Sequence, residues 1–494
     1  MPARRPGLPP RSAVPRTRTP AYVTVLAPAV LTVLLGLWGI RREGSLWQDE
    51  AVTYDMAHRA LPDLWATLGH VDAVHGLYYL VMHGVFRIWD GGLVALRLPS
   101  VLAMAGAAAG VAALGRRFAG TRAGLAAGAV FALLPVVQRY AQEGRSYALV
   151  TALVVAQTCV LVRACAERRR GWWAGYTVLG TLAVLLHEFA LPALAAHGVT
   201  VLAARLPRTA RAAWAAACCC ITVVTAPLVL LSLRQSRQVD WIAAPTAHDV
   251  LGFLLTAGAG LACATVLRRR TTAVSRRAGL GTAALPLLLL LLPPALLLLA
   301  CVLRPLYVDR YVLYAQAGLA LLAGAALDRV WRSVTPRAVP ALTTAAAAVV
   351  VAVLGPVGTD LRSPESRTDD VRAVSRALRD VAVPGDGVLF LPGSRRVWAL
   401  QQEPASYGLE DIALADAPHA SHTLYGEESP PAGIRGSMLR VSRIVVVREP
   451  TRERHESDAR EEAKEATLRA CFARRDSRVV GTARIDVYAR GDAC

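Results

Sequence analysis

The run YVTVLAPAVLTVLLGLWGI, residues 22–40, decides the fold, because it is long, apolar and free of charged side chains. A helix of this length, rising about 1.5 Å per residue, crosses a bilayer core of roughly 30 Å. Many apolar runs of similar length follow, and 54% of the 494 residues are hydrophobic. The chain is therefore predicted to be a polytopic α-helical membrane protein.

The formal net charge of +19 is concentrated in short arginine clusters between the apolar runs. Such clusters are typical of the cytoplasmic loops of membrane proteins, so the charge gives no reason to expect a nucleic-acid partner. Residues 1–20 contain five Arg, six Pro and no acid. We expect residues 1–21 to form a disordered cytoplasmic tail.

Keeping the arginine clusters on the cytoplasmic side predicts about 11 transmembrane helices in the cell membrane. In chain order the expected spans are 22–40, 98–114, 123–137, 146–164, 172–187, 189–204, 212–233, 249–267, 279–303, 311–328 and 338–356. An odd number of spans puts the N-terminus in the cytoplasm and the end of the chain outside. Residues 22–356 then form the transmembrane domain, with 41–97 as a large first outer loop, and 357–494 form an extracytoplasmic domain. Within the first outer loop, the aromatic segment 75–90 is expected to be an interfacial helix.

The C-terminal segment alternates between helix and strand patterns. Helices are predicted at 369–380 and 456–473, and strands at 388–391, 443–447 and 479–488. This alternation is typical of a small α/β domain.

Two of the nine cysteines, Cys471 and Cys494, lie outside the apolar runs. In an oxidising external compartment we expect this pair to form a disulfide. The sequence has no C-x-x-C motif, and no group of side chains demands a metal, so no cofactor is predicted.

A pair of acids, Asp49 and Glu50, follows the first span in the motif Trp47-Gln48-Asp49-Glu50. A carboxylate near the headgroup plane is well placed to act as a general base on a substrate that lives in the membrane. Both acids are therefore candidate catalytic residues. Ordinary solvated loop acids are the alternative interpretation.

Further polar groups are predicted on the same outer face. The candidate substrate-binding residues are Asp72, His75, Tyr79, Glu143, Arg145, Arg310 and Tyr311. Arginine presents a planar, permanently charged fork that suits phosphate oxygens, so acids and arginines together suit chemistry on an anionic lipid headgroup. The alternatives are interfacial anchors, a local ion pair between Glu143 and Arg145, and membrane-belt aromatics at Tyr147 and Tyr311.

The order of these motifs resembles a known superfamily. The segments are Trp47 to Ala51, Asp72 with His75 to Leu80, Arg97 to Ser100, and Gln142 to Ala148. They are similar to polyprenyl-phosphate-dependent glycosyltransferases of the GT-C superfamily, in particular to the bacterial membrane form of the protein-mannosyltransferase and aminoarabinose-transferase branch. The chain departs from that branch at residues 75–79, which read His-Gly-Leu-Tyr-Tyr where the family usually shows His-Pro-Pro-Leu-Tyr-Tyr.

The resemblance implies an integral membrane glycosyltransferase, a hexosyltransferase similar to mannosyltransferases. It implies a polyprenyl-phosphate sugar donor, an acceptor hydroxyl on a protein, lipid or glycan at the outer face, and inversion at the anomeric carbon. It assigns the base that activates the acceptor to Asp49. Some members of the superfamily use a divalent metal, and here that question is left open.

Two other kinds of protein are alternatives. A transporter or lipid flippase would need ionisable groups near the middle of the bilayer, and the predicted spans are almost free of charge. A catalytically inactive scaffold of the cell envelope would not need the acid pair at 49–50.

Overall fold

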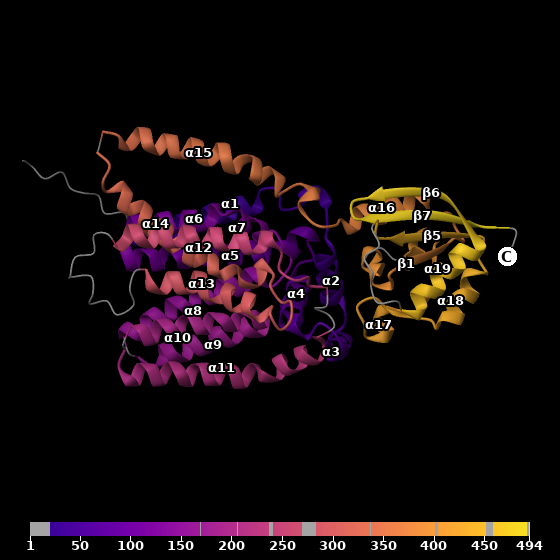
Figure 1. The fold of residues 1–494 in the computed structure, drawn as a ribbon, viewed down its shortest axis with the longest axis horizontal. Coiled ribbons are helices and arrows are strands. Elements are labelled where there is room, and N and C mark those ends of the chain that lie inside the picture. Colours follow the sequence, from indigo (N-terminus) through magenta and orange to yellow (C-terminus); the bar gives the residue numbers. More distant parts are fainter. Residues whose placement is uncertain are drawn as a thin grey trace, which may run out of the picture.

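The computed structural model describes residues 20–167, 169–204, 206–236, 241–268, 283–335, 337–400, 404–450, 458–491 and 494. The predicted cytoplasmic tail lies almost entirely outside these residues. Figure 1 shows a bundle of long helices with a smaller sheet-containing domain at one end. The chain is thus a helical membrane protein that carries a small α/β domain at its C-terminal end.

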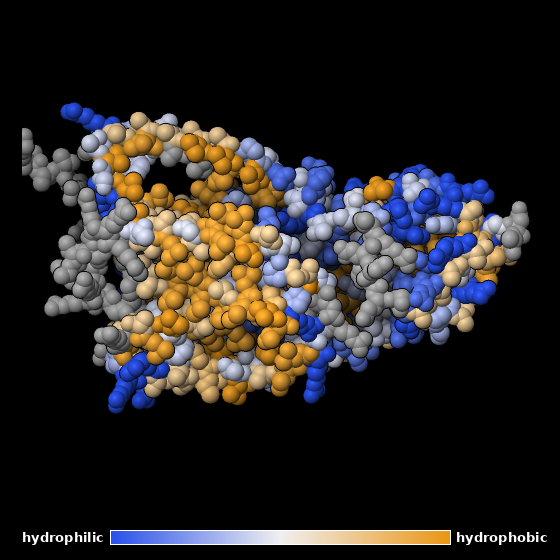
Figure 2. All heavy atoms as spheres, in the orientation of Figure 1, coloured by the Kyte–Doolittle hydropathy of each residue, from blue (hydrophilic) through white to orange (hydrophobic). Residues whose placement is uncertain are grey.

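Helices occur at each of the predicted spans. They are α1 (Ala21–Leu37), α5 (Leu93–Ala119), α6 (Thr121–Leu133), α7 (Pro135–Ala141), α8 (Tyr147–Glu167), α9 (Arg170–Leu186), α10 (Leu191–Ala203), α11 (Arg208–Arg234), α12 (Ala247–Arg268), α13 (Ala284–Ala300), α14 (Gln316–Trp331) and α15 (Val339–Asp360). Seven helical segments in the described chain are long and apolar enough to cross a membrane, or eight if a bent pair counts as one span. The count of eleven therefore stays a prediction. Figure 2 shows the apolar surface spread over this bundle and the hydrophilic surface over the C-terminal domain.

The third predicted span, 123–137, is not one straight helix. It is divided into α6 and α7, whose axes differ by 64°. The break lies at Leu134, directly before Pro135, because proline has no N–H to continue the helical hydrogen bonds and disfavours helical backbone in the residue before it. The turn that follows α7 contacts the first outer loop, where the Gly144 N–H donates to Glu50 Oε1 at 3.0 Å.

The segment predicted as the first outer loop, residues 41–97, is itself helical. It contains α2 (Gln48–His58), α3 (Leu61–His70) and α4 (Gly76–Ile88), with short 3-10 turns at Arg42–Gly44 and Ala73–His75. The predicted helix at 75–90 corresponds to α4. Tyr78, Tyr79 and Met82 of α4 are completely buried, so this helix packs into the protein through one face.

The C-terminal domain has a five-stranded sheet with the strand order β2-β1-β5-β7-β6. The strands are β1 (Gly387–Leu391), β2 (Glu410–Asp411), β5 (Arg443–Arg448), β6 (Phe472–Val480) and β7 (Ala483–Arg490), and a separate pair is formed by β3 (Leu414–Asp416) and β4 (Glu427–Glu428). The helices are α16 (Val371–Val381), α17 (Pro418–Ser421), α18 (Pro431–Met438) and α19 (Ala459–Cys471). Further 3-10 turns in the chain are Glu188–Ala190, Asp309–Ala315, Pro364–Ser366, Gly393–Ala399 and Pro404–Tyr407.

Alternating side chains divide the core of this domain between the two faces of the sheet. Val388 and Phe390 of β1 pack in one cluster with α16, whereas Leu389 and Leu391 pack in another with α18 and α19. The predicted strands at 388–391 and 443–447 are confirmed. The predicted strand at 479–488 is wrong in its extent: the structure has a hairpin there. Its turn lies at Gly481, whose φ of 57° favours glycine.

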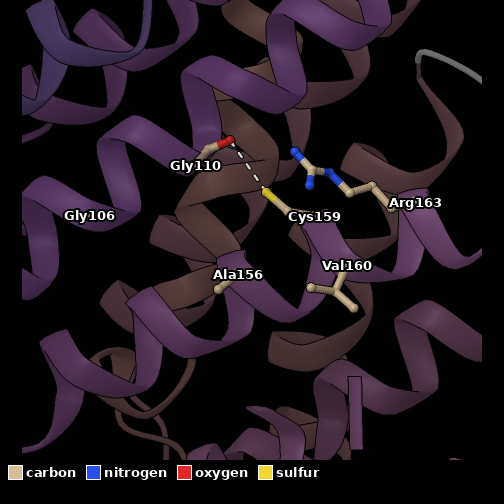
Figure 3. A pocket seen from close by; sticks show the side chains of 6 residues that line it. All are labelled: Gly106, Gly110, Ala156, Cys159, Val160 and Arg163. Carbon is tan, nitrogen blue, oxygen red and sulfur yellow. Dashed lines mark hydrogen bonds between the residues drawn. The ribbon is translucent and has the colours of Figure 1, made fainter. Parts of the chain in front are cut away.

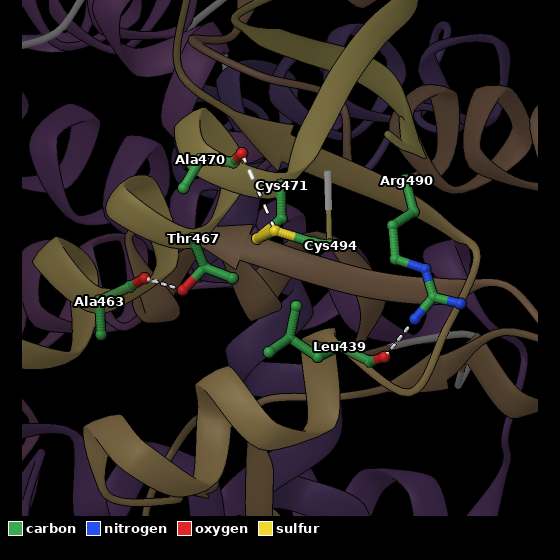
Figure 4. The surroundings of a disulfide bond; sticks show 7 residues. All are labelled: Leu439, Ala463, Thr467, Ala470, Cys471, Arg490 and Cys494. Carbon is green, nitrogen blue, oxygen red and sulfur yellow. Dashed lines mark hydrogen bonds between the residues drawn. A yellow bond between two sulfur atoms is a disulfide. The ribbon is translucent and has the colours of Figure 1, made fainter. Parts of the chain in front are cut away.

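The disulfide between Cys471 and Cys494 is confirmed, and it ties the end of the chain to α19 (Figure 4). A bridge that closes a loop with a sequence separation of 23 is expected to stabilise the domain by about 3 kcal/mol. Replacing both cysteines with serine should therefore lower the melting temperature of the domain, measured by thermal unfolding of the full chain. The free Cys263, replaced by serine, is the control. A double variant that melts like wild type would contradict this prediction.

Candidate active site

Asp49 and Glu50 are neighbours in the first turn of α2, but their side chains have different surroundings. The Asp49 side chain is 23% exposed, whereas the Glu50 side chain is completely buried. The alternative interpretation takes both acids as ordinary solvated loop acids. They lie in a helix instead, where successive side chains point about 100° apart. The structure therefore leaves one acid accessible and encloses the other.

Glu50 is the centre of a buried charge cluster. Arg97 donates to Oε1 at 2.7 Å and to Oε2 at 2.6 Å, and Arg42 donates to Oε2 at 2.8 Å. The Gly144 N–H donates to Oε1 at 3.0 Å. Burial would raise the pKa of Glu50, but the two guanidiniums and the Gly144 bond outweigh burial and lower the pKa to about 2. Protein groups thus occupy both carboxylate oxygens, and Glu50 ties α2 to α5 and to the turn after α7.

Replacing Glu50 with glutamine is expected to destabilise the fold by about 3–5 kcal/mol, because it leaves two buried guanidiniums without their carboxylate. Thermal unfolding of the purified protein measures the effect. The exposed Glu43 is the matched control, and Glu43→Gln should melt like wild type. Identical melting temperatures for both variants would show that the cluster does not stabilise the protein.

Arg145 is the cation that faces Asp49. Its Nε lies 3.8 Å from Asp49 Oδ2, and its Nη1 donates to Thr53 Oγ1 and to the Tyr79 hydroxyl, each at 3.3 Å. Arg145 lies in the turn between α7 and α8 and is 6% exposed. These bonds fix the orientation of the guanidinium, with its charge beside the accessible carboxylate.

Asp72 and Tyr79 lie next to Arg145. The Tyr79 hydroxyl donates to Asp72 Oδ2, and Asp72 has a left-handed φ of 62°, which aspartate tolerates. Burial raises the pKa of Asp72, against the opposing effects of Arg145 and of the Tyr79 hydrogen bond. Gly76 allows Leu68 to pack closely, since a Cβ at position 76 would come within 2.9 Å of Leu68 Cδ1. Asp72 and Tyr79 are in contact despite the departure from the family pattern at residues 75–79.

His75 accepts a hydrogen bond from Arg145. Arg145 Nη2 lies 2.8 Å from His75 Nε2, and a guanidinium can only donate, so the ring proton is assigned to Nδ1. Burial lowers the pKa of His75 well below its usual range, and Arg145 and Arg310 lower it further. Nδ1 is buried and has no hydrogen-bond partner among the described residues. A ligand oxygen at this position would satisfy it.

Arg310 is surrounded by aromatic rings. Its guanidinium carbon lies 5.4–5.8 Å from the ring centroids of Trp47, Tyr147, Trp241 and Tyr311. Its Nε donates to the Tyr147 hydroxyl at 3.2 Å. Tyr147 and Tyr311 are buried. The membrane-belt interpretation of these two tyrosines is therefore wrong, because belt aromatics face the lipid headgroups.

The alternative interpretation of the sequence predicts an ion pair between Glu143 and Arg145. In the structure Glu143 pairs with Arg367 instead. Its Oε2 lies 3.5 Å from Nε of Arg367, which also donates to the Arg139 carbonyl at 2.9 Å. Burial raises the pKa of Glu143, and Arg367 opposes this effect. Glu143 therefore joins the turn after α7 to the segment directly before α16.

Sequence reasoning missed the residues that the C-terminal domain brings to this site. Burial raises the pKa of the Tyr425 hydroxyl. The charges of Asp72 and Asp49 raise this pKa further, and those of Arg145 and Arg395 oppose the increase. Nearby, Arg59 Nη1 donates to the Thr423 carbonyl at 2.9 Å, which holds this segment against the first outer loop. No local pattern around Tyr425 marks it, because its neighbours at the site are distant in the sequence.

A separate cavity of about 250 Å³ lies between α5 and α8 (Figure 3). Its lining residues are Gly106, Gly110, Ala156, Cys159, Val160 and Arg163. Gly106 lies nine positions beyond Arg97 in α5, which corresponds to roughly 14 Å along the helix. This cavity is therefore distinct from the cluster around Asp49.

Comparisons with known proteins fit this arrangement. The family model for dolichyl-phosphate-mannose-protein mannosyltransferase matches residues 77–232. No curated protein matches the sequence significantly. Among solved structures, ArnT from Cupriavidus metallidurans bound to undecaprenyl phosphate shares 14% identity and has a TM-score of 0.56, with 96% of this chain and 99% of that chain covered. Its apo state has a TM-score of 0.59 at 14% identity, with 95% and 98% covered.

An archaeal structure has the same architecture. The apo oligosaccharyltransferase of Archaeoglobus fulgidus has a TM-score of 0.51 at 11% identity, with 86% of this chain and 69% of that chain covered. ArnT and this enzyme are both GT-C glycosyltransferases. The chain has the GT-C fold. The fold that the resemblance implies is thereby confirmed, and the cluster around Asp49 lies at one end of this helix bundle (Figure 1).

Proposed function

We propose that the chain is a membrane glycosyltransferase that moves a hexose, such as mannose, from a polyprenyl-phosphate donor to an acceptor hydroxyl, with inversion. The observation that carries the proposal is the pair formed by Asp49 and Arg145, an accessible carboxylate 3.8 Å from a buried guanidinium. In such a transfer, the proton acceptor and the cation that binds the phosphate act on the same reacting centre. The pair supplies both groups.

The phosphate side of the site consists of Arg145, Arg310 and His75. The guanidiniums attract the phosphate oxygens, and the His75 Nδ1–H lacks a protein acceptor in the described chain. A phosphate that binds Arg145 would compete with Asp49 for the guanidinium and leave the carboxylate to the acceptor hydroxyl. Undecaprenyl phosphate in the ArnT complex supports a polyprenyl phosphate as the carrier.

The reaction is a single displacement. The acceptor oxygen attacks the anomeric carbon on the side opposite the phosphate, and the hydroxyl proton passes to Asp49. The bond between the anomeric carbon and the phosphate oxygen breaks, and its electron pair leaves with polyprenyl phosphate. For Glu50 we propose a positioning role in place of a catalytic one, because both of its oxygens are already bound to protein groups.

We place the reaction at the outer face of the membrane. The first outer loop and the C-terminal domain lie at the same end of the bundle (Figure 1). The disulfide in that domain supports an external location, because disulfides persist in oxidising compartments. This orientation puts the N-terminus in the cytoplasm.

Purified protein incubated with radiolabelled polyprenyl-phosphate-mannose and envelope fractions tests the proposal. We expect the label to leave the lipid and to appear in a protein, lipid or glycan of the envelope. Protein that binds undecaprenyl phosphate but transfers no sugar from any polyprenyl-phosphate donor would be a lipid-binding protein, and the proposal would be wrong.

A further inference from the structure

The start of α2 is held by a segment that is distant in the sequence. Residues 369–371 lie against residues 46–48, directly before Asp49. Asp369 Oδ1 accepts from the Gln48 N–H at 3.0 Å, and Asp370 Oδ1 accepts from the Leu46 N–H at 3.2 Å. The Val371 N–H donates to the Leu46 carbonyl at 2.7 Å. These bonds connect the C-terminal domain to the backbone that carries Asp49.

Asp369 supplies what α2 lacks at its N-terminus. Trp47 occupies the N-cap position, and its side chain makes no capping hydrogen bond. The first N–H groups of a helix have no partner within the helix, and the helix dipole favours a negative charge beside them. The Asp369 carboxylate meets both requirements by accepting from Gln48, the first residue of α2.

The other oxygen of Asp369 connects to the interior of the C-terminal domain. Oδ2 accepts from the Trp398 indole N–H at 3.1 Å, and the Trp398 carbonyl accepts from the Ser375 hydroxyl at 2.7 Å. Asp369 and Trp398 are both buried. From the same domain, Arg395 Nη1 donates to the Gln48 side-chain oxygen at 3.1 Å. Both the backbone and the side chain of Gln48 are thus bound to this domain.

Asp49 therefore lies between two restrained neighbours. Gln48 is held by Asp369 and Arg395 of the C-terminal domain, and Glu50 is held by the buried arginine cluster. The Asp49 side chain itself is partly open and has the Arg145 guanidinium at 3.8 Å. Its position is determined largely by the backbone on either side.

We propose that Asp369 is a positioning residue for Asp49, and that through Asp369 the C-terminal domain sets the geometry of the catalytic base. This inference rests on the proposed role of Asp49. A base displaced by about 1 Å can lose on the order of 10²-fold in rate, although its substrate still binds. The C-terminal domain is then part of the catalytic unit.

The test compares Asp369→Ala with Asp386→Ala in the full chain. Asp386 is a matched control, because it is a buried aspartate of the same domain that accepts from the Val383 N–H at 3.0 Å and pairs with Arg443, away from α2. We expect Asp369→Ala to lower kcat by about 10- to 100-fold with little change in KM for the donor. Asp386→Ala should lose activity only in proportion to its folded fraction. Asp369→Asn retains one acceptor oxygen, so it should recover part of the activity.

Two further readouts separate positioning from a general structural role. In an Asp49→Asn background, Asp369→Ala should cause no further loss, because residues that act through one group are not additive. The proposal is overturned if Asp369→Ala lowers kcat equally in the wild-type and Asp49→Asn backgrounds. It is also overturned if Asp369→Ala and Asp386→Ala lower kcat equally.

Hydrogen exchange tests the positioning role without an activity assay. In Asp369→Ala, exchange should rise at the Ala51 amide, which donates to the Trp47 carbonyl and is not itself bonded to Asp369. It should not rise in Asp386→Ala. If the Ala51 amide of Asp369→Ala exchanges at the wild-type rate, the proposal is overturned. If wild-type protein transfers no sugar, the proposed function is refuted instead. The exchange result then still decides whether Asp369 positions α2.

Discussion

Asp49→Asn is expected to lower the transfer rate by about 10²- to 10⁴-fold, the usual contribution of a general base. Asparagine has nearly the same shape, so α2 and the neighbouring Glu50 cluster should keep their structure. The amide cannot accept the proton of the acceptor hydroxyl. Binding of undecaprenyl phosphate should stay within a few-fold of wild type, because Arg145 and Arg310 remain in place.

The matched control for this variant is Asp63→Asn. Asp63 also lies in the first turn of a helix of the first outer loop, α3, and is not part of the candidate site. Its variant should transfer sugar at the wild-type rate. Near-normal turnover in Asp49→Asn would remove Asp49 from the mechanism and leave Asp72 as the next candidate base.

Arg145→Lys is expected to lower the transfer rate by about 10²- to 10³-fold, although it keeps the positive charge. A lysine ammonium cannot face Asp49 and also bond to Thr53, Tyr79 and His75, as the guanidinium does. Affinity for undecaprenyl phosphate should fall as well, because the planar fork for phosphate oxygens is lost.

Arg87→Lys is the control for Arg145→Lys, since Arg87 is an exposed arginine of α4. Titration of undecaprenyl phosphate onto each purified variant gives the affinity, and initial rates give the transfer. If Arg145→Lys binds and transfers like Arg87→Lys, Arg145 is only an anchor of the turn between α7 and α8.

Local sequence patterns predicted the elements well, because hydropathy and turn residues are local properties. The apolar runs correspond to helices, and β1, β5 and the disulfide lie where the sequence predicted them. The errors arose where one residue interrupts a pattern. Pro135 bends the third span, and Gly481 turns a predicted strand into a hairpin.

The site was only partly predictable, because its connections are long-range. The motifs identified Asp49 and Arg145, and the predicted outer-face position identified Arg310. In the structure Asp49 pairs with Arg145, and Arg310 packs against Trp47 and Tyr147 beside them. The sequence did not separate Asp49 from Glu50, since the burial of Glu50 depends on Arg42 and Arg97. It also did not indicate Asp369 and Tyr425, which reach the site from the C-terminal domain.

The most direct test of the account is to measure both products formed from a polyprenyl-phosphate sugar of known anomeric configuration. We predict that polyprenyl phosphate and glycosylated acceptor form in equal amounts, and that the new glycoside has the opposite configuration, because Asp49 supports a single displacement. A glycoside that retains the donor's configuration would contradict the account. So would folded protein that leaves the sugar on the lipid when envelope acceptor is supplied.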